Sequence, residues 1–172
     1  MGGGVTLLLA LCAVLLLLMP AAANAAEVTS GQCGSKLTWS YDPEDKTLTI
    51  DGSGDMWDYE TDGHGAFNEG VDPDKVAPWA YLDFDSLVLG DNVTSIGDYA
   101  FAYTSMQWFP VWDEMKLKSI GVGAFSHTKL RGFYAPKSLK VIEDSAFSGH
   151  YECLEFVELN DGLEYILSLI HI

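Results

Sequence analysis

Apolar residues recur at a nearly fixed interval through the second half of the chain. Isoleucine opens a short, similar segment at Ile96, Ile120 and Ile142, and Ile166 follows, so that the spacings are 24, 22 and 24 positions. The first three segments share the pattern I-x-x-x-A-F. A second apolar column lies three positions before each isoleucine and consists of Val93, Leu117, Leu139 and Leu163. Self-similarity at such a period is typical of repeat architectures, so we predict a stack of similar units.

Each unit also carries two alternating apolar positions ahead of its isoleucine. Such alternation predicts a short strand with one buried face, whereas the isoleucine segment suits a short helical turn. We therefore predict a β-rich repeat solenoid with short strands on one face and short helical turns on the other. The second unit is irregular, and we interpret its segment 108–111 as displaced by a four-residue insertion at 112–115. The alternating pairs are Leu87 and Leu89, Phe133 and Ala135, and Val157 and Leu159.

A single unit of this kind is too small to fold alone. The half-dozen side chains that one unit could bury stabilise it by less than the entropy cost of ordering its backbone. Neighbouring units must therefore cover both of its faces. We assign residues 81–166 to about three and a half such repeats.

The segment that precedes the repeats has a different pattern. Residues 37–50 alternate between apolar and polar side chains on both sides of the turn-forming residues 42–46, which predicts a β-hairpin. Its apolar face is expected to cap the first repeat. Residues 51–75 are rich in Gly and Asp and are expected to form a long loop. We assign residues 27–80 to this N-terminal hairpin cap and acidic loop.

The extreme N-terminus has the pattern of an export signal. The first 26 residues contain no Asp, Glu, Lys or Arg, and residues 5–19 form an apolar run. That run is short for a membrane span, and Ala23 and Ala25 fit the small-residue pattern of a signal-peptidase site. We predict that residues 1–25 are a signal peptide and that the protein is secreted or displayed at the cell surface, with no membrane insertion after cleavage.

The last six residues break the repeat. Residues 167–172, LSLIHI, do not continue the pattern that follows the other isoleucines. They resemble the translation of a transposon adapter used in sequencing libraries. We interpret residues 167–172 as a non-native tail and expect the native protein to continue past residue 166.

Several segments together resemble one known family. The string SLVLGDNVTSIGDYAF at 86–101 is similar to the repeat of BspA-like leucine-rich-repeat proteins, which are bacterial, and in some cases protozoal, surface and secreted proteins. The segments CGSKLTW (33–39), LTIDGSGDMWDY (48–59) and APW (77–79) resemble the segments that precede the repeats in that family. This resemblance covers nearly all of 31–166. It implies a leucine-rich-repeat fold and a role in adhesion to host or matrix proteins and to other cells.

The charge balance limits the kinds of partner that the chain can bind. The chain carries 9 basic and 25 acidic residues, for a net charge of −16. Such a surface repels phosphate backbones and anionic headgroups, so nucleic acid is excluded as a partner.

Two cysteines, Cys33 and Cys153, remain after signal cleavage. The sequence leaves open whether they bond to each other, stay separate thiols or pair with a residue outside this chain.

No motif of the sequence indicates catalysis. It contains no G-x-S-x-G, H-E-x-x-H or Walker pattern, and His64, His127 and His150 are scattered singly. We predict a non-enzymatic protein without a cofactor. The segment DGSGDMWDYETD at 51–62 offers oxygen ligands of the kind that Ca²⁺ prefers, but Met56 stands where an EF-hand loop has glycine. Solvated acidic turns are the preferred interpretation, and no metal site is predicted.

A basic segment gives the first candidate binding residues. Six basic residues and no acidic residue lie between Lys116 and Lys140. Lys118 and Lys140 hold equivalent positions in successive repeats and are expected to lie on adjacent rungs about 5 Å apart. Such a pair favours an anionic partner, for example an acidic glycan or a carboxylate-rich protein. A solvated edge without a ligand is the alternative.

The outward side of the strands gives the second set of candidates. If the alternating pairs point inward, the residues between them, Val88, Tyr134 and Glu158, point outward. Phe156 belongs to a neighbouring outward column, and Trp108 is expected to join these residues despite its shifted register. Aligned aromatic rings offer a large contact area at a low entropy cost, as protein and carbohydrate recognition requires. The alternative is that flanking loops cover these rings.

Together these observations predict a secreted or cell-surface leucine-rich-repeat recognition module that mediates adhesion or protein binding without catalysis. Its expected partner is a host or matrix protein or a cell-surface glycan. The alternative is an accessory repeat region of a larger secreted enzyme whose catalytic domain lies beyond residue 166. A purely structural spacer is a third hypothesis.

Overall fold

The structure, a computed structural model, describes residues 29–61, 72–149 and 153–167. The predicted signal peptide, His64, His150 and all of the predicted tail except Leu167 lie outside these residues. Within them, the chain forms short strands joined by turns, together with one short 3₁₀ helix, η2 (Pro73–Lys75). The strands are β1 (Ser30–Gln32), β2 (Leu37–Asp42), β3 (Thr47–Asp55), β4 (Ser86–Leu89), β5 (Asn92–Ile96), β6 (Ser119–Ile120), β7 (Gly132–Tyr134), β8 (Val141–Ile142), β9 (Phe156–Glu158) and β10 (Tyr165–Ile166).

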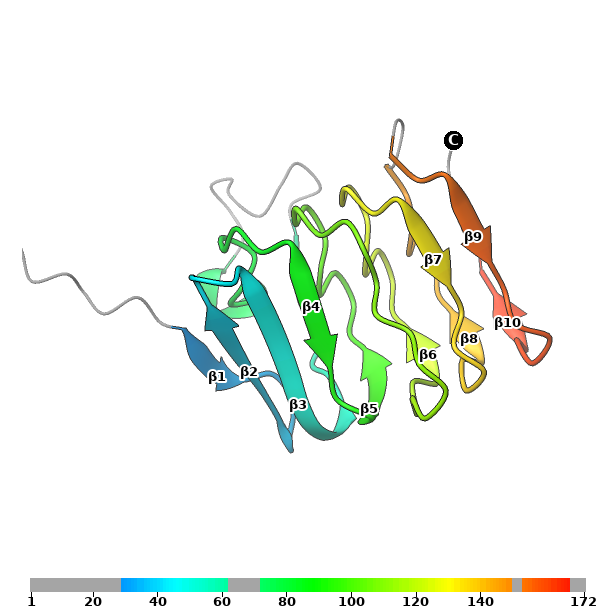
Figure 1. Cartoon of the computed structure of the whole chain (residues 1–172), viewed down its shortest axis with the longest axis horizontal. Helices are drawn as coiled ribbons and strands as arrows, with labels where there is room; N and C mark the ends of the chain where they lie inside the picture. Colours follow the sequence, from blue (N-terminus) through cyan, green and yellow to red (C-terminus); the bar gives the residue numbers. More distant parts are fainter. Residues whose placement is uncertain (1–28, 62–71, 150–152, 168–172) are drawn as a thin grey trace, which may run out of the picture.

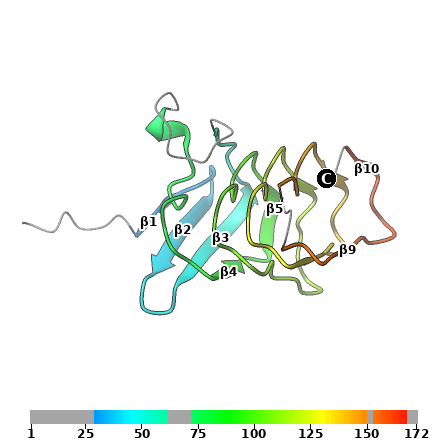
Figure 2. The same ribbon diagram turned by 90° about the horizontal axis from the view of Figure 1, so that it is seen from above.

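The repeats stack side by side, and each contributes to two rows of strands (Figure 1). One row contains β4, β7 and β9, and the other contains β5, β6, β8 and β10. We call each repeat, from its first-row strand to its closing turns, a rung. Seen from above, the rungs follow one another from the β2–β3 hairpin at one end to β9 and β10 at the other (Figure 2).

The isoleucine column predicted from the sequence is confirmed by the strand register. Ile96 of β5 pairs with Ile120 of β6, which pairs with Ile142 of β8, which pairs with Ile166 of β10, always in parallel. The first three are almost wholly buried, whereas Ile166 on the last rung is 42% exposed. The second column behaves in the same way, because Val93, Leu117 and Leu139 are buried and Leu163 is only partly buried against the same core. The side chains of each column are therefore buried because the rungs on both sides cover them.

A row of aromatic rings runs through the interior. Phe101, Phe125 and Phe147 hold equivalent positions, and the centroids of successive rings lie 5.5 Å apart. Trp79 continues this row at the N-terminal end, 5.7 Å from Phe101, and its indole Nε1 donates a hydrogen bond of 2.7 Å to the carbonyl of Ala100. All four side chains are fully buried. The core is thus one continuous stack shared by all rungs.

The third side of each rung is a chain of tight turns, where the sequence had predicted short helical turns. In the first rung the amides of Ala100, Ala102 and Thr104 each donate to the carbonyl three residues earlier. The amides that alternate with them, those of Tyr99, Phe101 and Tyr103, donate instead to carbonyls of the next rung. In a helix every amide would bond within its own segment, whereas here alternate amides bond to the adjacent rung and hold the two rungs together. Left-handed φ angles, 51° at Tyr99 and 61° at Tyr103, also interrupt any helical path.

The irregular second rung carries a smaller insertion than the sequence suggested. Trp108 forms a parallel bridge with Gly132 of β7, so Trp108 is the counterpart of Gly132. Twelve positions separate Trp108 from Ile120, against ten from Gly132 to Ile142. The insertion is therefore two residues and not four, and the corner between the two rows absorbs it.

The predicted hairpin is present, but its second strand is longer than expected. β2 and β3 pair in antiparallel register, and β3 continues to Asp55 into the segment expected to be a loop. Its first half pairs with β4 and its second half with β5. Gly52 and Gly54, with φ angles of 115° and 101°, permit the change of direction between these halves. One strand thereby adjoins both rows, and a capping role for the hairpin stays a prediction.

The two described cysteines, Cys33 and Cys153, are both free thiols. Cys33 is fully buried beside the hairpin, and burial raises the pKa of its thiol from 9.0 to about 12. Cys153 is partly exposed in the last rung. In the described parts of the chain, no helix combines the length and apolar character needed to cross a membrane.

Alanine substitution in the isoleucine column should show how much of its stability comes from neighbouring rungs. We expect Ile120→Ala to lower the free energy of unfolding by about 2–5 kcal/mol, because Ile120 is enclosed on both sides. The matched change Ile166→Ala should cost less than about 1.5 kcal/mol, because much of that side chain is already in solvent. Urea unfolding of the two variants measures both values, and equal losses would contradict the stacked arrangement.

The cysteines should differ in reactivity toward iodoacetamide. At pH 8 the raised pKa leaves Cys33 with on the order of 1,000-fold less thiolate than an ordinary cysteine, and the reagent cannot reach it. We expect Cys33 in the folded protein to be alkylated at least about 100-fold more slowly than Cys153. Peptide mass spectrometry measures each site separately, and in guanidinium the two rates should converge. Equal rates in the folded state would show that Cys33 is not enclosed.

Candidate recognition face

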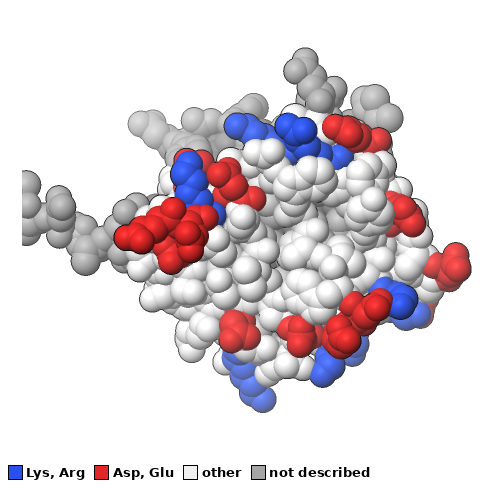
Figure 3. Space-filling model, in the orientation of Figure 1, with Lys and Arg blue, Asp and Glu red and all other residues white. Residues whose placement is uncertain are grey.

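Four exposed apolar side chains lie on the outward side of the first row. Val88 is in β4, Tyr134 in β7 and Phe156 in β9, and Trp108 takes the place of a strand residue in the second rung. Trp108 is 57% exposed and Tyr134 is 51% exposed. Figure 3 shows a wide uncharged area over this row, with Asp, Glu, Lys and Arg gathered near its margins. We call the surface formed by Val88, Trp108, Tyr134 and Phe156 the aromatic face.

The strands hold these residues outward by alternation. Leu87 and Leu89 flank Val88 and are buried, and Phe133, beside Tyr134, is buried against Phe109 and Phe147. Each outward side chain therefore stands on a strand that is anchored from behind by the core. No described loop covers the four side chains, which removes the alternative that flanking loops bury them in these parts of the chain.

The last rung departs from this pattern on its inward side. Val157 was expected to be buried and is only partly buried, and Leu159 is 40% exposed. Their counterparts in earlier rungs gain their burial from the following rung. In the described residues no rung packs beyond β9 and β10.

Two of the aromatic side chains form a contact pair across rungs. The centroids of the Tyr134 and Phe156 rings lie 4.8 Å apart at an interplanar angle of 57°. The Phe156 ring also covers Gly132, so that a Cβ atom added at Gly132 would overlap the ring. The absence of a side chain at Gly132 is therefore what lets the Phe156 ring lie over that residue, in contact with Tyr134. Gly132 is not among the residues that the sequence predicts for this face, because a missing side chain leaves no signal in the pattern of apolar positions.

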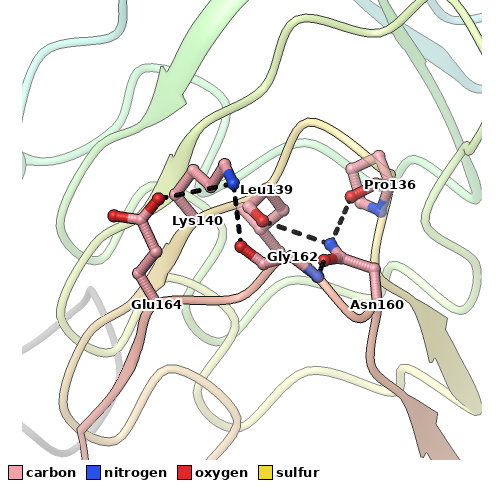
Figure 4. Close-up of polar contacts among 6 residues, drawn as sticks. All are labelled: Pro136, Leu139, Lys140, Asn160, Gly162 and Glu164. Carbon is pink, nitrogen blue, oxygen red and sulfur yellow. Dashed lines mark hydrogen bonds and ion pairs between the residues drawn. The ribbon is translucent and has the colours of Figure 1, made fainter.

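The two candidate lysines lie in the second row and not on the aromatic face. The backbone amide of Lys140 donates a hydrogen bond of 2.8 Å to the carbonyl of Lys118, so the two residues are adjacent, as predicted. Figure 4 shows the Lys140 ammonium turned toward the last rung, where it donates to the Gly162 carbonyl at 2.9 Å and pairs with Glu164 at 3.4 Å. Lys140 is thus already partnered by a carboxylate. This arrangement weakens the hypothesis of an anion held between the two lysines.

Other basic side chains of the same segment also have partners in a neighbouring rung. Lys116 donates to the Asn92 side-chain oxygen at 2.6 Å, and Lys137 pairs with Asp113 at 2.8 Å. This pairing raises the pKa of Lys137 and lowers the pKa of Asp113. Both groups are well exposed, so solvent screens the pair and its contribution to stability is small.

An amide side chain joins the same corner of the last two rungs. The Asn160 side-chain amide donates to the carbonyls of Pro136 and Leu139, and its oxygen accepts from the Gly162 amide at 2.7 Å (Figure 4). These contacts satisfy turn carbonyls that no strand partner reaches. The basic and amide residues of this corner therefore join rungs to one another.

Acidic side chains of the segment considered for Ca²⁺ accept hydrogen bonds from the protein itself. Asp51 accepts from the Gly52 amide, Asp55 from the Thr94 hydroxyl and Asp58 from the Asp98 amide. Asp62 lies outside the described residues. Among the residues that are described, no three His, Cys, Asp or Glu side chains gather as a metal site would require.

Comparison with known proteins agrees with this architecture. A family model described as the BspA type leucine rich repeat region matches residues 79–170 in six copies. The chain therefore belongs to the BspA-type leucine-rich-repeat family.

A search of solved structures finds a leucine-rich repeat protein from Eubacterium ventriosum, at 17% sequence identity and a TM-score of 0.38. The alignment covers 77% of this chain and 44% of that protein, so this chain spans less than half of its length. No curated protein matches the chain.

Substitution of Gly132 should disturb the aromatic face through Phe156. We expect Gly132→Ala to cost about 1–3 kcal/mol of stability, because the added methyl group displaces the Phe156 ring. In a Phe156→Ala background the same change should cost less than about 0.5 kcal/mol. A double-mutant cycle in urea measures this coupling. An equal cost in both backgrounds would show that the ring does not lie over Gly132.

Proposed function

We propose that this chain is a non-catalytic recognition module, exported to the cell surface or beyond it, that binds a protein partner through the aromatic face. Membership of the BspA-type family supports a repeat module that binds other proteins. The observation that carries the proposal is the exposure of Val88, Trp108, Tyr134 and Phe156 on one uncharged surface. Large apolar side chains grouped in solvent are costly unless a partner covers them.

The composition of the face favours a protein as the partner. Tryptophan and tyrosine are enriched among the residues that dominate the energetics of protein interfaces, and the centre of such interfaces is depleted in charge. Trp108, Tyr134 and Phe156 supply rings, and Val88 extends the apolar surface toward the hairpin. Because strands and core hold these residues in place, little conformational entropy is lost when a partner binds.

The charged margins of the face add specificity. A net charge of −16 steers partners with basic surfaces toward the protein and repels acidic ones. Lys118 offers one positive group in the other row of strands, where Lys140 is held by Glu164. We propose an apolar contact on a host or matrix protein whose surroundings are basic. Lys118 and Lys140 contribute less to this contact than the rings do.

The competing hypotheses make different predictions for the same residues. A structural spacer needs no exposed aromatic face, and an accessory region of an enzyme would act together with a separate catalytic domain. Neither hypothesis accounts for four apolar side chains that lie outside the core on one row of strands. Recognition does account for them.

Binding to purified matrix proteins tests the proposal. The wild-type protein would be immobilised and exposed to laminin, collagen and fibronectin in biolayer interferometry. We expect at least one of these proteins to bind. We expect Trp108→Ala and Tyr134→Ala each to raise the dissociation constant by about tenfold or more.

Tyr81→Ala provides the matched control. Tyr81 is 56% exposed, comparable with Tyr134, but it lies outside the first row of strands. Its substitution should leave binding unchanged within a factor of about two. Equal effects of all three substitutions, or wild-type binding in the two face variants, would overturn the assignment of the aromatic face.

A further inference from the structure

A second surface feature lies on the side of the molecule formed by the turns. There, a hollow of about 370 Å³ extends across successive rungs. Its volume is within the range of sites that bind small molecules. The residues that matter for its chemistry are Tyr99, Tyr103, Ser126, His127, Ser145 and Ser148. None of them belongs to the aromatic face.

The rings of the hollow are held by contacts between rungs. Tyr103 and His127 are stacked almost parallel, with centroids 4.7 Å apart and an interplanar angle of 5°. The His127 ring covers Gly149, and the Tyr99 ring covers Gly123. Each ring thus rests on the following rung. The walls of the hollow are therefore formed before any ligand arrives.

The backbone conformation under these rings is costly for the residues that occupy it. Tyr99, Tyr103 and His127 have φ angles of 51°, 61° and 54°, in the left-handed region where side chains are disfavoured. The equivalents of Tyr99 in the following rungs are Gly123 and Ser145, and the equivalent of Tyr103 and His127 is Gly149. Of these, only the glycines adopt this region without penalty. Glycine would therefore adopt this backbone conformation at a lower energy cost at all three positions. Rings that occupy this strained conformation outside the buried core indicate a role in binding.

The lining determines the class of ligand. Among the described residues, the lining contains aromatic rings and hydroxyl groups and no Asp, Glu, Lys or Arg side chain. Hydroxyls both donate and accept hydrogen bonds, and ring faces pack against C–H surfaces. A sugar ring presents C–H groups on its faces and hydroxyls around its edge. The net charge of −16 disfavours acidic sugars.

We propose that this hollow binds a neutral hexose unit, with the Tyr99 and Tyr103 rings packed against its C–H groups and the serine hydroxyls bonded to its edge. The site is separate from the aromatic face and does not depend on the protein-binding role proposed above. A single hexose of about 12 non-hydrogen atoms is expected to bind weakly, with a dissociation constant on the order of 1 mM.

Saturation-transfer NMR with free sugars tests this site. The full chain would be titrated with D-glucose, D-galactose and D-mannose, and with D-glucuronate as the acidic counterpart. We expect at least one neutral hexose to receive saturation from the protein and glucuronate to receive less. The absence of transfer to all three hexoses, or stronger transfer to glucuronate, would overturn the proposal.

Variants then locate the binding. Ser148→Phe fills the hollow and should abolish saturation transfer, and His127→Ala removes one ring of the stacked pair and should weaken binding at least about fivefold. Circular dichroism of each variant checks its fold, and if Ser148→Phe does not fold, His127→Ala decides the outcome. Trp108→Ala on the aromatic face is the matched control and should bind hexose as the wild type does. Hexose binding that survives His127→Ala, or is lost in Trp108→Ala, would place the sugar elsewhere.

Discussion

The contact between neighbouring rungs is the interaction on which the whole structure depends. Each of the first three rungs contributes one ring to the Phe101–Phe125–Phe147 row and one isoleucine to the adjacent column, and none of these is buried by its own rung alone. Backbone amides on the turn side reinforce the contact, because every second one donates to the next rung. At the last rung, where this cover ends in the described chain, Leu159 and Ile166 are partly in solvent. Stability in such an array is a property of the interfaces between units.

The sequence was sufficient to predict the stack, but it did not predict how the turns are closed. The isoleucine column and the hairpin follow from periodicity, because a buried column requires the same kind of residue at each step. The turns were predicted to be helical because Ala and Phe four and five positions after Ile also suit a helix. The left-handed angles at Tyr99 and Tyr103 could not be foreseen, since tyrosine rarely adopts them. The outward direction of Trp108 and Tyr134 followed from alternation, whereas the pairing of Lys140 with Glu164 depends on side-chain geometry that a linear pattern does not carry.

Both proposed surfaces use the same structural device, an aromatic ring of one rung resting on a glycine of its neighbour. Phe156 covers Gly132 on the strand side, and on the turn side Tyr99 covers Gly123 and His127 covers Gly149. A ring placed in this way is fixed by the backbone beneath it. Rigid rings lose little entropy on contact with a ligand, so the arrangement suits recognition of either a protein or a sugar. Because the device needs only a glycine and a ring one repeat apart, it can arise wherever two rungs meet.

The two-residue insertion in the second rung shows where such a molecule tolerates change. Trp108 still aligns with Gly132, and Ile120 still aligns with its column, although the chain between them is longer than in the third rung. The additional residues are taken up at a corner where Val111, Asp113 and Glu114 are exposed. Length variation at that corner leaves both walls of the array unaltered. The corners are therefore the positions where added residues are tolerated. An unchanged array could acquire new binding specificities through longer corner segments.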